Sequence, residues 1–379
     1  MILNIVGYSY NDLKIVPAVT SRVDSRSQCN PFDKNGMLPI FASCMSTVVD
    51  TKNYQIFKKN KIYPVIPRNI DLLSRLSLML EGNWVALSLN EFKEQFVNGK
   101  QESNKTYYVC VDIANGHMES LYNICFKAKA RAELNNYTLV IMTGNIANPE
   151  TYKWMCENCI YTKKDGTKEC CIDYIRLSIG TGSQCTTSSN VGCHYPVSSL
   201  IEGCYNYKKL YKETNPQIKY PHIIADGGCR NFDHVNIALA LGADYVMIGG
   251  LFAEMYESAS PLMLKSIPDD WSGQMYIEAD YQYTDEEKKR KDVRNRELWK
   301  ECYGMSTKKA QALIGKTTKT AEGKHSMLRV KYTLKQWTNN MESYLRSIMS
   351  YCDSFTLEDY IGKQKLIPCS PGTMLAINK

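Results

Sequence analysis

Eight short apolar runs recur along the first two thirds of the chain, each bounded by turn or capping residues. The runs are almost wholly apolar rather than alternating, which is typical of strands buried on both faces of a parallel sheet. They span residues 38–43, 63–66, 84–89, 107–113, 138–142, 174–179, 222–225 and 245–248.

Helical periodicity fills most of the gaps between these runs, at residues 54–59, 72–80, 118–134, 149–157, 197–214 and 231–241. Eight strands alternating with helices predict a (β/α)8 TIM barrel, which takes about 250 residues. The alternative α/β fold is a doubly wound open sheet, but no GxGxxG turn follows the first run. We therefore predict a barrel whose strands span about 38–248.

The rest of the chain predicts no second domain. Residues 268–299 form a polar excursion that we expect to end in a solvated helix, a further helix is predicted over 334–347, and the tail after residue 361 is expected to be irregular. We expect one catalytic domain over 1–379, with an active-site segment and C-terminal helix at 300–353 and no inserted regulatory module.

Composition narrows the class of protein. A hydrophobic fraction of 44% with 22% charged residues is ordinary for a soluble domain. The net charge of +7 comes with one dense basic run, so nucleic acid is not an expected partner. No apolar stretch reaches the roughly 18–20 residues of a membrane span, and no signal peptide is predicted. In a long chain without a predicted export signal, we interpret the fifteen cysteines as reduced thiols, which favours a cytoplasmic location.

Four of the cysteines are clustered: Cys156 and Cys159 form a CxxC, and Cys170 and Cys171 follow a polar loop. Four thiols around a turn can bind tetrahedral zinc. An adjacent pair is poor ligand spacing, however, so we interpret them as free thiols, with zinc or a redox role as alternatives.

Unusual residues follow the predicted strands, where a (β/α)8 barrel places its active site. The loops after strands seven and eight read ADGG and IGG, and their backbone N–H groups are expected to bind phosphate. Ser183 can add a hydroxyl, and Asp226 can accept from a ribose diol. The alternative is that these glycines only form tight turns. Gly227, Gly228, Gly249 and Gly250 are the residues concerned.

The loop after strand six, LSIGTGSQCTT, presents Cys185 among glycines and hydroxyls. A cysteine attacks as its thiolate, which oriented N–H groups or positive charge favour. Most cysteines are small buried hydrophobes, but the loop around Cys185 marks this one as a candidate nucleophile.

Several motifs together resemble those of the IMP dehydrogenase/GMP reductase family. They are SIGTGSQCTT, IIADGGCRNFDHVNIALALGADYVMIGG, YGMST, LPIFASCMSTV, VCVDIANGH, MTGNIANPETY and AEGK, over roughly residues 8–353. The resemblance implies a barrel that binds a purine nucleotide, GMP or IMP, with Cys185 bonded to purine C2. The implied substrate contacts are Ser183, Asp226, Gly227, Gly228, Gly249, Gly250, Tyr303, Gly304, Met305 and Ser306.

The resemblance also implies a nicotinamide cofactor that exchanges hydride with C2, and a homotetramer. A monovalent cation, K⁺, is expected at Gly180, Gly182 and Cys185. The implied cofactor contacts are Arg68, Asp112, Ala114, Asn115, Gly116, Lys319 and Lys324.

Within the family, dehydrogenases activate water with an Arg-Tyr pair on a long flap, whereas reductases expel ammonia. This chain has no Arg-Tyr dipeptide, and only 18 residues separate Tyr303 from Glu322. We therefore expect NADPH-dependent conversion of GMP to IMP through a cysteine thioimidate, with Thr187 and Glu322 handling the ammonia proton. The alternatives are a minimal IMP dehydrogenase and a catalytically impaired nucleotide-binding homologue, since Ser46, Pro67 and Ser188 depart from the family pattern.

Overall fold

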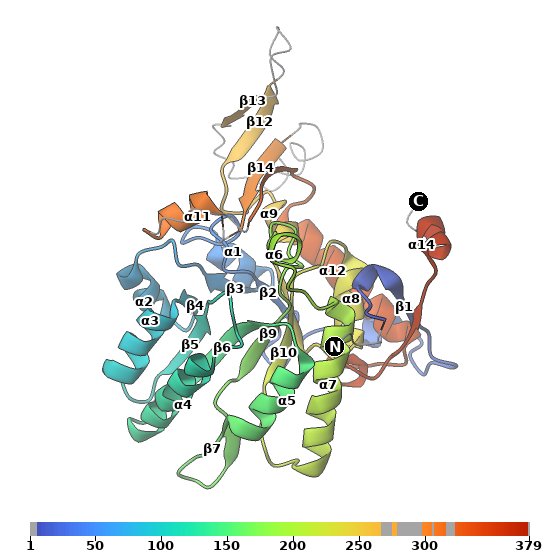
Figure 1. Ribbon diagram of the computed structural model, residues 1–379. Coiled ribbons are helices and arrows are strands. Elements are labelled where there is room, and N and C mark those ends of the chain that lie inside the picture. Colours follow the sequence, from blue (N-terminus) through green and yellow to red (C-terminus); the bar gives the residue numbers. More distant parts are fainter. Residues whose placement is uncertain (1–5, 267–274, 279–297, 305–306, 316–322, 378–379) are drawn as a thin grey trace.

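The computed structural model describes residues 6–266, 275–278, 298–304, 307–315 and 323–377. Eight parallel strands close into a barrel in the order β10-β11-β2-β3-β4-β5-β6-β9 (Figure 1). The predicted (β/α)8 fold is therefore confirmed. The barrel strands are β2 (Ile40–Ala42), β3 (Tyr63–Ile66), β4 (Trp84–Leu87), β5 (Thr106–Val111), β6 (Thr138–Ile146), β9 (Tyr174–Leu177), β10 (His222–Asp226) and β11 (Tyr245–Ile248).

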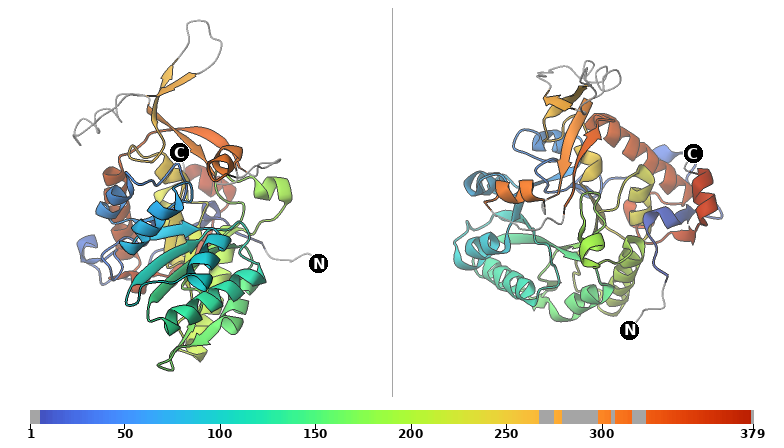
Figure 2. Two further views of the ribbon diagram at one scale, coloured as in Figure 1. Left: turned by 90° about the vertical axis from the view of Figure 1, so that its left-hand side faces the viewer. Right: turned by 45° about the horizontal axis from the view of Figure 1, so that its top comes forward.

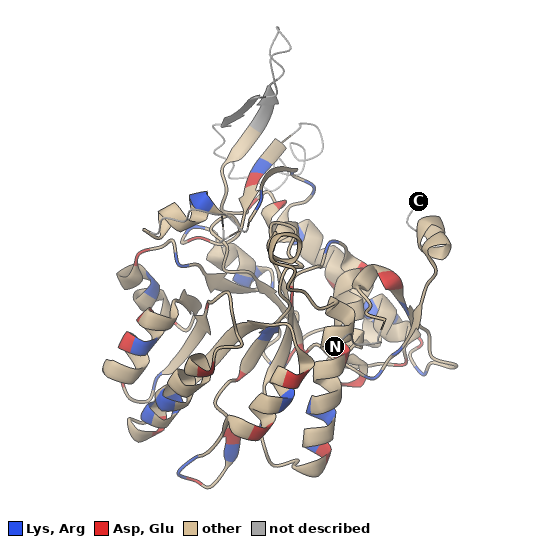
Figure 3. Cartoon of the chain, in the orientation of Figure 1, with Lys and Arg blue, Asp and Glu red and all other residues tan. Residues whose placement is uncertain are grey.

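Helices surround this barrel, as the view with its top turned forward shows (Figure 2). Both signs of charge occur along the outer helices α4 and α7 (Figure 3). Helices that follow barrel strands, together with the long α12, include α1 (Tyr54–Lys59), α2 (Leu72–Leu80), α3 (Leu89–Lys93), α4 (Glu119–Leu134), α5 (Pro149–Asn158), α7 (Val197–Thr214), α8 (Phe232–Ala240) and α12 (Leu334–Tyr351). Among the helices that the structure describes, none combines the length and apolar content needed to cross a bilayer.

Shorter elements complete the chain. A four-stranded antiparallel sheet, ordered β13-β12-β14-β15, projects beyond one end of the barrel (Figure 1). The shorter elements are η1 (Tyr10–Asp12), β1 (Leu13–Val16), η2 (Arg26–Gln28), η3 (Glu94–Asn98), β7 (Ile160–Thr162), β8 (Lys168–Cys170), α6 (Thr187–Val191), α9 (Gly250–Ala253), β12 (Leu262–Ser266), β13 (Met275–Glu278), β14 (Leu298–Tyr303), α11 (Lys308–Leu313), β15 (His325–Arg329), α13 (Leu357–Tyr360), β16 (Lys365–Pro368) and α14 (Pro371–Ile377).

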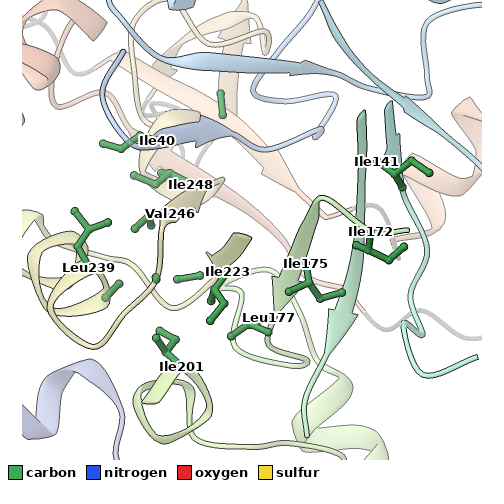
Figure 4. Packing of buried hydrophobic residues seen from close by; sticks show 14 of the residues in the cluster. Ile40, Ile141, Ile172, Ile175, Leu177, Ile201, Ile223, Leu239, Val246 and Ile248 are labelled. Carbon is green, nitrogen blue, oxygen red and sulfur yellow. The ribbon is translucent and has the colours of Figure 1, made fainter. Parts of the chain in front are cut away.

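Alternate residues of each barrel strand belong to two different cores, because successive side chains of a strand point to opposite faces. Val246 and Ile248 of β11 pack outward in one cluster with Leu239 of α8 (Figure 4). Met247, between them, belongs to a second cluster inside the barrel, together with Phe41. The apolar runs are thus explained by strands that are buried on both faces.

Several predicted boundaries were wrong. The run 84–89 ends as a strand at Leu87, because the Ser88 side chain accepts a hydrogen bond from the Glu91 N–H and caps α3. The tail after residue 361 is not irregular: β16 pairs antiparallel with β1, and α14 follows. The helix expected at the end of the 268–299 excursion lies outside the described residues.

The zinc alternative finds no support. Within the residues that the structure describes, no group of three His, Cys, Asp or Glu side chains could hold a metal ion. Cys156, Cys159, Cys170 and Cys171 are all free and buried among apolar side chains. Burial also raises the pKa of the Cys156 thiol, which disfavours the thiolate that a metal requires. These four side chains serve as small core residues.

Candidate active site

A cavity of about 620 Å³ opens at the carboxyl ends of the barrel strands. Loops after most of the barrel strands contribute to its lining, as expected for the catalytic face of this fold. The predicted site residues that line it are Arg68, Asp112, Ala114, Gly180, Gly182, Ser183, Cys185, Thr187, Asp226, Gly227, Gly228, Gly249, Gly250 and Gly304.

Cys185 lies in the loop between β9 and α6, and its side chain is partly buried. The loop contains two residues with positive φ, Ser178 (φ 94°) and Gly180 (φ 78°). The Cys185 thiol donates to Thr187 Oγ1 at 3.3 Å. A hydroxyl therefore lies beside the thiol at the cavity rim, where it can exchange a proton with a group bonded to sulfur.

A second segment closes against this loop. The Lys324 N–H donates to the Gln184 carbonyl at 2.7 Å, and Gly323 forms an antiparallel bridge with Cys185. Ser326 Oγ donates to Gln184 Oε1 at 3.0 Å. The residues directly after Glu322 are thus held beside the thiol, although Glu322 itself is outside the described residues.

The two glycine pairs pack against the same loop. A Cβ added to Gly250 would come 2.8 Å from Ser183 Oγ, and one added to Gly227 (φ +110°) would come 2.6 Å from Thr181 Oγ1. α9 begins at Gly250, and the first N–H groups of a helix have no partner within it. The left-handed backbone requires glycine at position 227, close packing favours it at position 250, and Ser183 lies against Gly250 of the strand-eight loop.

A charged network fills the floor of the cavity, centred on Arg176 of β9. Its Nη atoms lie 3.3 Å from Asp112 Oδ1, and Nη2 donates to Asn145 Oδ1 at 2.6 Å. Its Nε lies 3.1 Å from Asp226 Oδ2, an ion pair without the alignment of a hydrogen bond. Arg68 Nε donates to Asp112 Oδ2 at 2.9 Å, which adds a second guanidinium at the cavity side.

The two carboxylates of this network have opposite pKa shifts. Burial alone would raise the pKa of Asp112, but Arg68 and Arg176 outweigh it and hold that pKa below its ordinary value. Burial dominates at Asp226 and raises its pKa, with Arg176 and a hydrogen bond from Asn145 offsetting only part of the effect. Asp112 is thus the firmly ionised partner, while Asp226 is the more easily protonated one.

Arg176 was not among the predicted site residues. The signal for Arg176 was present, since an arginine interrupts the apolar run YIRL, and a buried charge needs partners. The structure places it in the barrel interior, between the outward-packing Ile175 and Leu177.

Some predicted residues lie away from the described lining of the cavity. Gly116 donates its N–H to the Asn145 carbonyl at 3.0 Å and packs against the carboxyl end of β6. Asn115 caps its own loop through a bond from the His117 N–H, and the Tyr303 ring stacks on His325. Lys324 is exposed. Met305, Ser306, Lys319 and Glu322 lie outside the described residues.

Comparison with known proteins finds several GMP reductases that are similar to this chain in sequence. GMP reductase of Onchocerca volvulus is 28% identical over 228 residues, covering 57% of this chain and 56% of that protein. GMP reductase of Caenorhabditis elegans is 28% identical over 243 residues, covering 60% and 59%. GMP reductase of Buchnera aphidicola subsp. Baizongia pistaciae is 28% identical over 300 residues, covering 78% and 70%.

The chain therefore spans less than two thirds of the length of the two nematode relatives it matches. A family model described as the IMP dehydrogenase / GMP reductase domain matches residues 100–375. Since this match covers most of the chain, the protein belongs to the IMP dehydrogenase/GMP reductase family.

Proposed function

We propose that this chain converts GMP to IMP and ammonia with NADPH, through a covalent bond between Cys185 and purine C2. The observation that carries this proposal is the shared cavity: the Cys185 thiol, its 3.3 Å contact with Thr187 Oγ1 and both glycine pairs line it together. The missing Arg-Tyr dipeptide favours loss of ammonia over hydrolysis.

The reaction balances as GMP, NADPH and two protons giving IMP, ammonium and NADP⁺. The Cys185 thiolate bonds to C2, and the exocyclic amino group leaves as ammonia once it has taken a proton. We assign that proton to Thr187 and Glu322. NADPH supplies, when bound, the hydride that C2 receives. The C2–S bond then breaks, and Cys185 leaves as thiolate.

The nucleotide would lie with its phosphate in the corner formed by Ser183 and the two glycine pairs. Their N–H groups can approach phosphate oxygens because no Cβ intervenes. Asp226 would accept from the ribose diol, and Asn145 Nδ2, at 2.9 Å from Asp226 Oδ2, orients that carboxylate. We propose that the segment 303–306 contacts the base and phosphate.

The cavity also offers a fit for the cofactor. Arg68 and Ala114 line it beside the Cys185 loop, and Asp112 fixes the Arg68 guanidinium. We propose Arg68, Asp112 and Ala114 as contacts to the nicotinamide side. Lys319 and Lys324 carry the charge that a 2′-phosphate would require.

K⁺ at the Cys185 loop remains part of the proposal. The Gly180 carbonyl accepts from Ser188 Oγ at 2.9 Å, and the Gly182 carbonyl accepts from the Cys185 N–H at 2.9 Å. Each carbonyl keeps a second lone pair for a cation. We expect faster turnover in K⁺ than in Li⁺ at equal ionic strength. Equal rates in both salts would show that the reaction does not depend on K⁺.

The deciding experiment is a paired assay under reducing conditions. One arm contains GMP and NADPH and follows loss of NADPH absorbance, with IMP identified by chromatography; the other contains IMP and NAD⁺. Turnover in the first arm alone supports the reductase, and turnover in the second alone makes the chain a dehydrogenase. Thermal stabilisation by GMP without turnover in either arm would mark a binding protein.

Cys193 provides the matched control for the nucleophile, because its thiol is exposed and lies eight residues beyond Cys185. Cys185→Ala should abolish turnover, whereas Cys193→Ala should leave it unchanged. Full activity in Cys185→Ala would exclude the covalent mechanism.

A further inference from the structure

Two thiols share one guanidinium at the floor of the cavity. Cys44 follows β2, and Cys110 belongs to β5. Arg176 Nη1 donates to Cys110 Sγ at 3.1 Å and to Cys44 Sγ at 3.7 Å. Each thiol also influences the pKa of the other, which is consistent with their sharing this guanidinium. Two cysteines that are 66 residues apart in sequence therefore meet in one buried cluster.

The two sulfurs differ in their access to the cavity. Cys44 lines it and is 4% exposed, whereas Cys110 is fully buried behind it at 0%. A small solute in the cavity can thus reach Cys44 first, and Cys110 is positioned to attack Cys44 from the protein side. The proposed reaction uses neither thiol.

The surroundings favour a thiolate in this pair. A hydrogen bond from Cys44 lowers the pKa of Cys110 against the effect of burial, and Arg176 lowers it further. The pKa of Cys44 is correspondingly raised, because its S–H is held by Cys110. Cys110 is therefore the more acidic thiol of the pair and can accept the proton of Cys44 when the Cys44 sulfur reacts.

We propose that Cys44 and Cys110 form a peroxide-sensitive modification site that closes to a disulfide. The Cys44 sulfur attacks a hydroperoxide oxygen while its proton passes to Cys110, which gives a sulfenic acid on Cys44 and hydroxide as the O–O bond breaks. The Cys110 sulfur then attacks the Cys44 sulfur and forms the S–S bond, and the sulfenic oxygen leaves with the Cys110 proton as water. Two thiols and hydrogen peroxide thus give one disulfide and two water molecules.

Closure of this disulfide changes the site around it. A disulfide bond is about 2.05 Å long, so the sulfurs must approach beyond hydrogen-bond contact. Arg176, which also binds Asp112 and Asn145, loses its thiol partners. Met45 follows Cys44 and packs against Gly249, where an added Cβ would come 2.7 Å from Met45 Sδ. Oxidation is therefore expected to weaken nucleotide binding reversibly.

The test uses the Cys185→Ala protein, so that the proposed nucleophile cannot be oxidised. The full-length chain is treated with hydrogen peroxide, remaining thiols are alkylated, and the digest is mapped by mass spectrometry. We expect a reducible Cys44–Cys110 cross-link. Cys44→Ser in the same background should leave Cys110 alkylated, while Cys204→Ser, which alters a buried cysteine of α7, should retain the cross-link.

A second readout is the rise in melting temperature with GMP, which should be lost after peroxide and return with dithiothreitol. A Cys44 that stays alkylatable, is oxidised only to sulfinic acid, or pairs with another cysteine overturns the proposal. Mapping of the parent protein decides this even if a serine variant fails to fold. Formation of the cross-link requires no nucleotide. The disulfide proposal can therefore be confirmed even if the chain does not reduce GMP.

Discussion

Arg176 Nη2 donates a 2.6 Å hydrogen bond to Asn145 Oδ1, and this contact joins the carboxyl ends of β6 and β9. The same guanidinium faces Asp112, directly after β5, and Asp226, the last residue of β10. One buried cation therefore links the carboxyl ends of four barrel strands around the cavity.

Arg176→Met should destabilise the protein strongly. Removing one partner of a buried ion pair leaves uncompensated charge, which costs roughly 3–5 kcal/mol. Urea unfolding should show that loss at unchanged m-value. Arg22→Met is the control, since the Arg22 side chain in its Asp353 pair is 77% exposed and should matter little. Equal midpoints for both variants would contradict the assignment of Arg176.

Thr187→Val should slow the proposed reaction. The hydroxyl 3.3 Å from Cys185 Sγ is lost while the side-chain volume is kept, and general acid–base groups typically contribute about 100-fold or more. We expect kcat to fall by that order in steady-state kinetics. Thr186→Val should retain activity, because the Thr186 hydroxyl accepts a hydrogen bond from the Asn190 side chain, whereas the Cys185 thiol donates to Thr187. Similar rates in both variants would show that Thr187 does not handle the proton.

Gly116→Ala separates a structural role from a cofactor role. Its Cβ would come 2.7 Å from the Asn145 carbonyl oxygen, a backbone atom that cannot rotate away. Forcing an extra carbon into such packing costs about 1–3 kcal/mol. We expect lower unfolding stability together with lower kcat. Gly372→Ala, at an open position of α14, is the control. A raised KM for NADPH at unchanged stability would instead support a direct cofactor contact.

Lys300 should make the free energy of unfolding depend on pH in the alkaline range. Its side chain is buried, donates to the Ser258 carbonyl at 2.9 Å, and burial lowers its pKa to about 8. The unfolded chain, with a lysine pKa of about 10.4, binds more protons between these values. The penalty for burying the charge is therefore present below pH 8 and is relieved as pH rises.

The matching experiment compares the parent protein with Lys300→Met by urea unfolding from pH 7 to pH 10. The stability of the parent relative to the variant should rise by roughly 2–3 kcal/mol across that interval. A difference that stays constant with pH would show that Lys300 is not buried as a charge.

The barrel could be predicted because its signal is local. Each strand is a short apolar run, and burial on both faces is visible in the composition of that run alone. Cys185 and the glycine pairs were found for the same reason, since each motif directly follows its strand. The predicted end of the run 84–89 was wrong because the Ser88 side chain caps α3, so the strand ends at Leu87.

The charged floor of the cavity could not be predicted in this way. Arg176 is 64 residues from Asp112, and closure of the barrel brings them together. The packing of Gly116 against Asn145 likewise depends on the neighbouring strand β6. Pairwise contacts of this kind leave no periodic pattern in the sequence.

The pairing of β1 with β16 has a consequence for the order of folding. Leu13 lies opposite Pro368, so β1 has no strand partner until a segment about 355 residues further along the chain has been translated. Tyr10 precedes that strand, and its ring lies against Gly228, where an added Cβ would be 3.2 Å away. The barrel can close on the ribosome before this ribbon forms, but the wall of the cavity beside Gly228 is completed only afterwards.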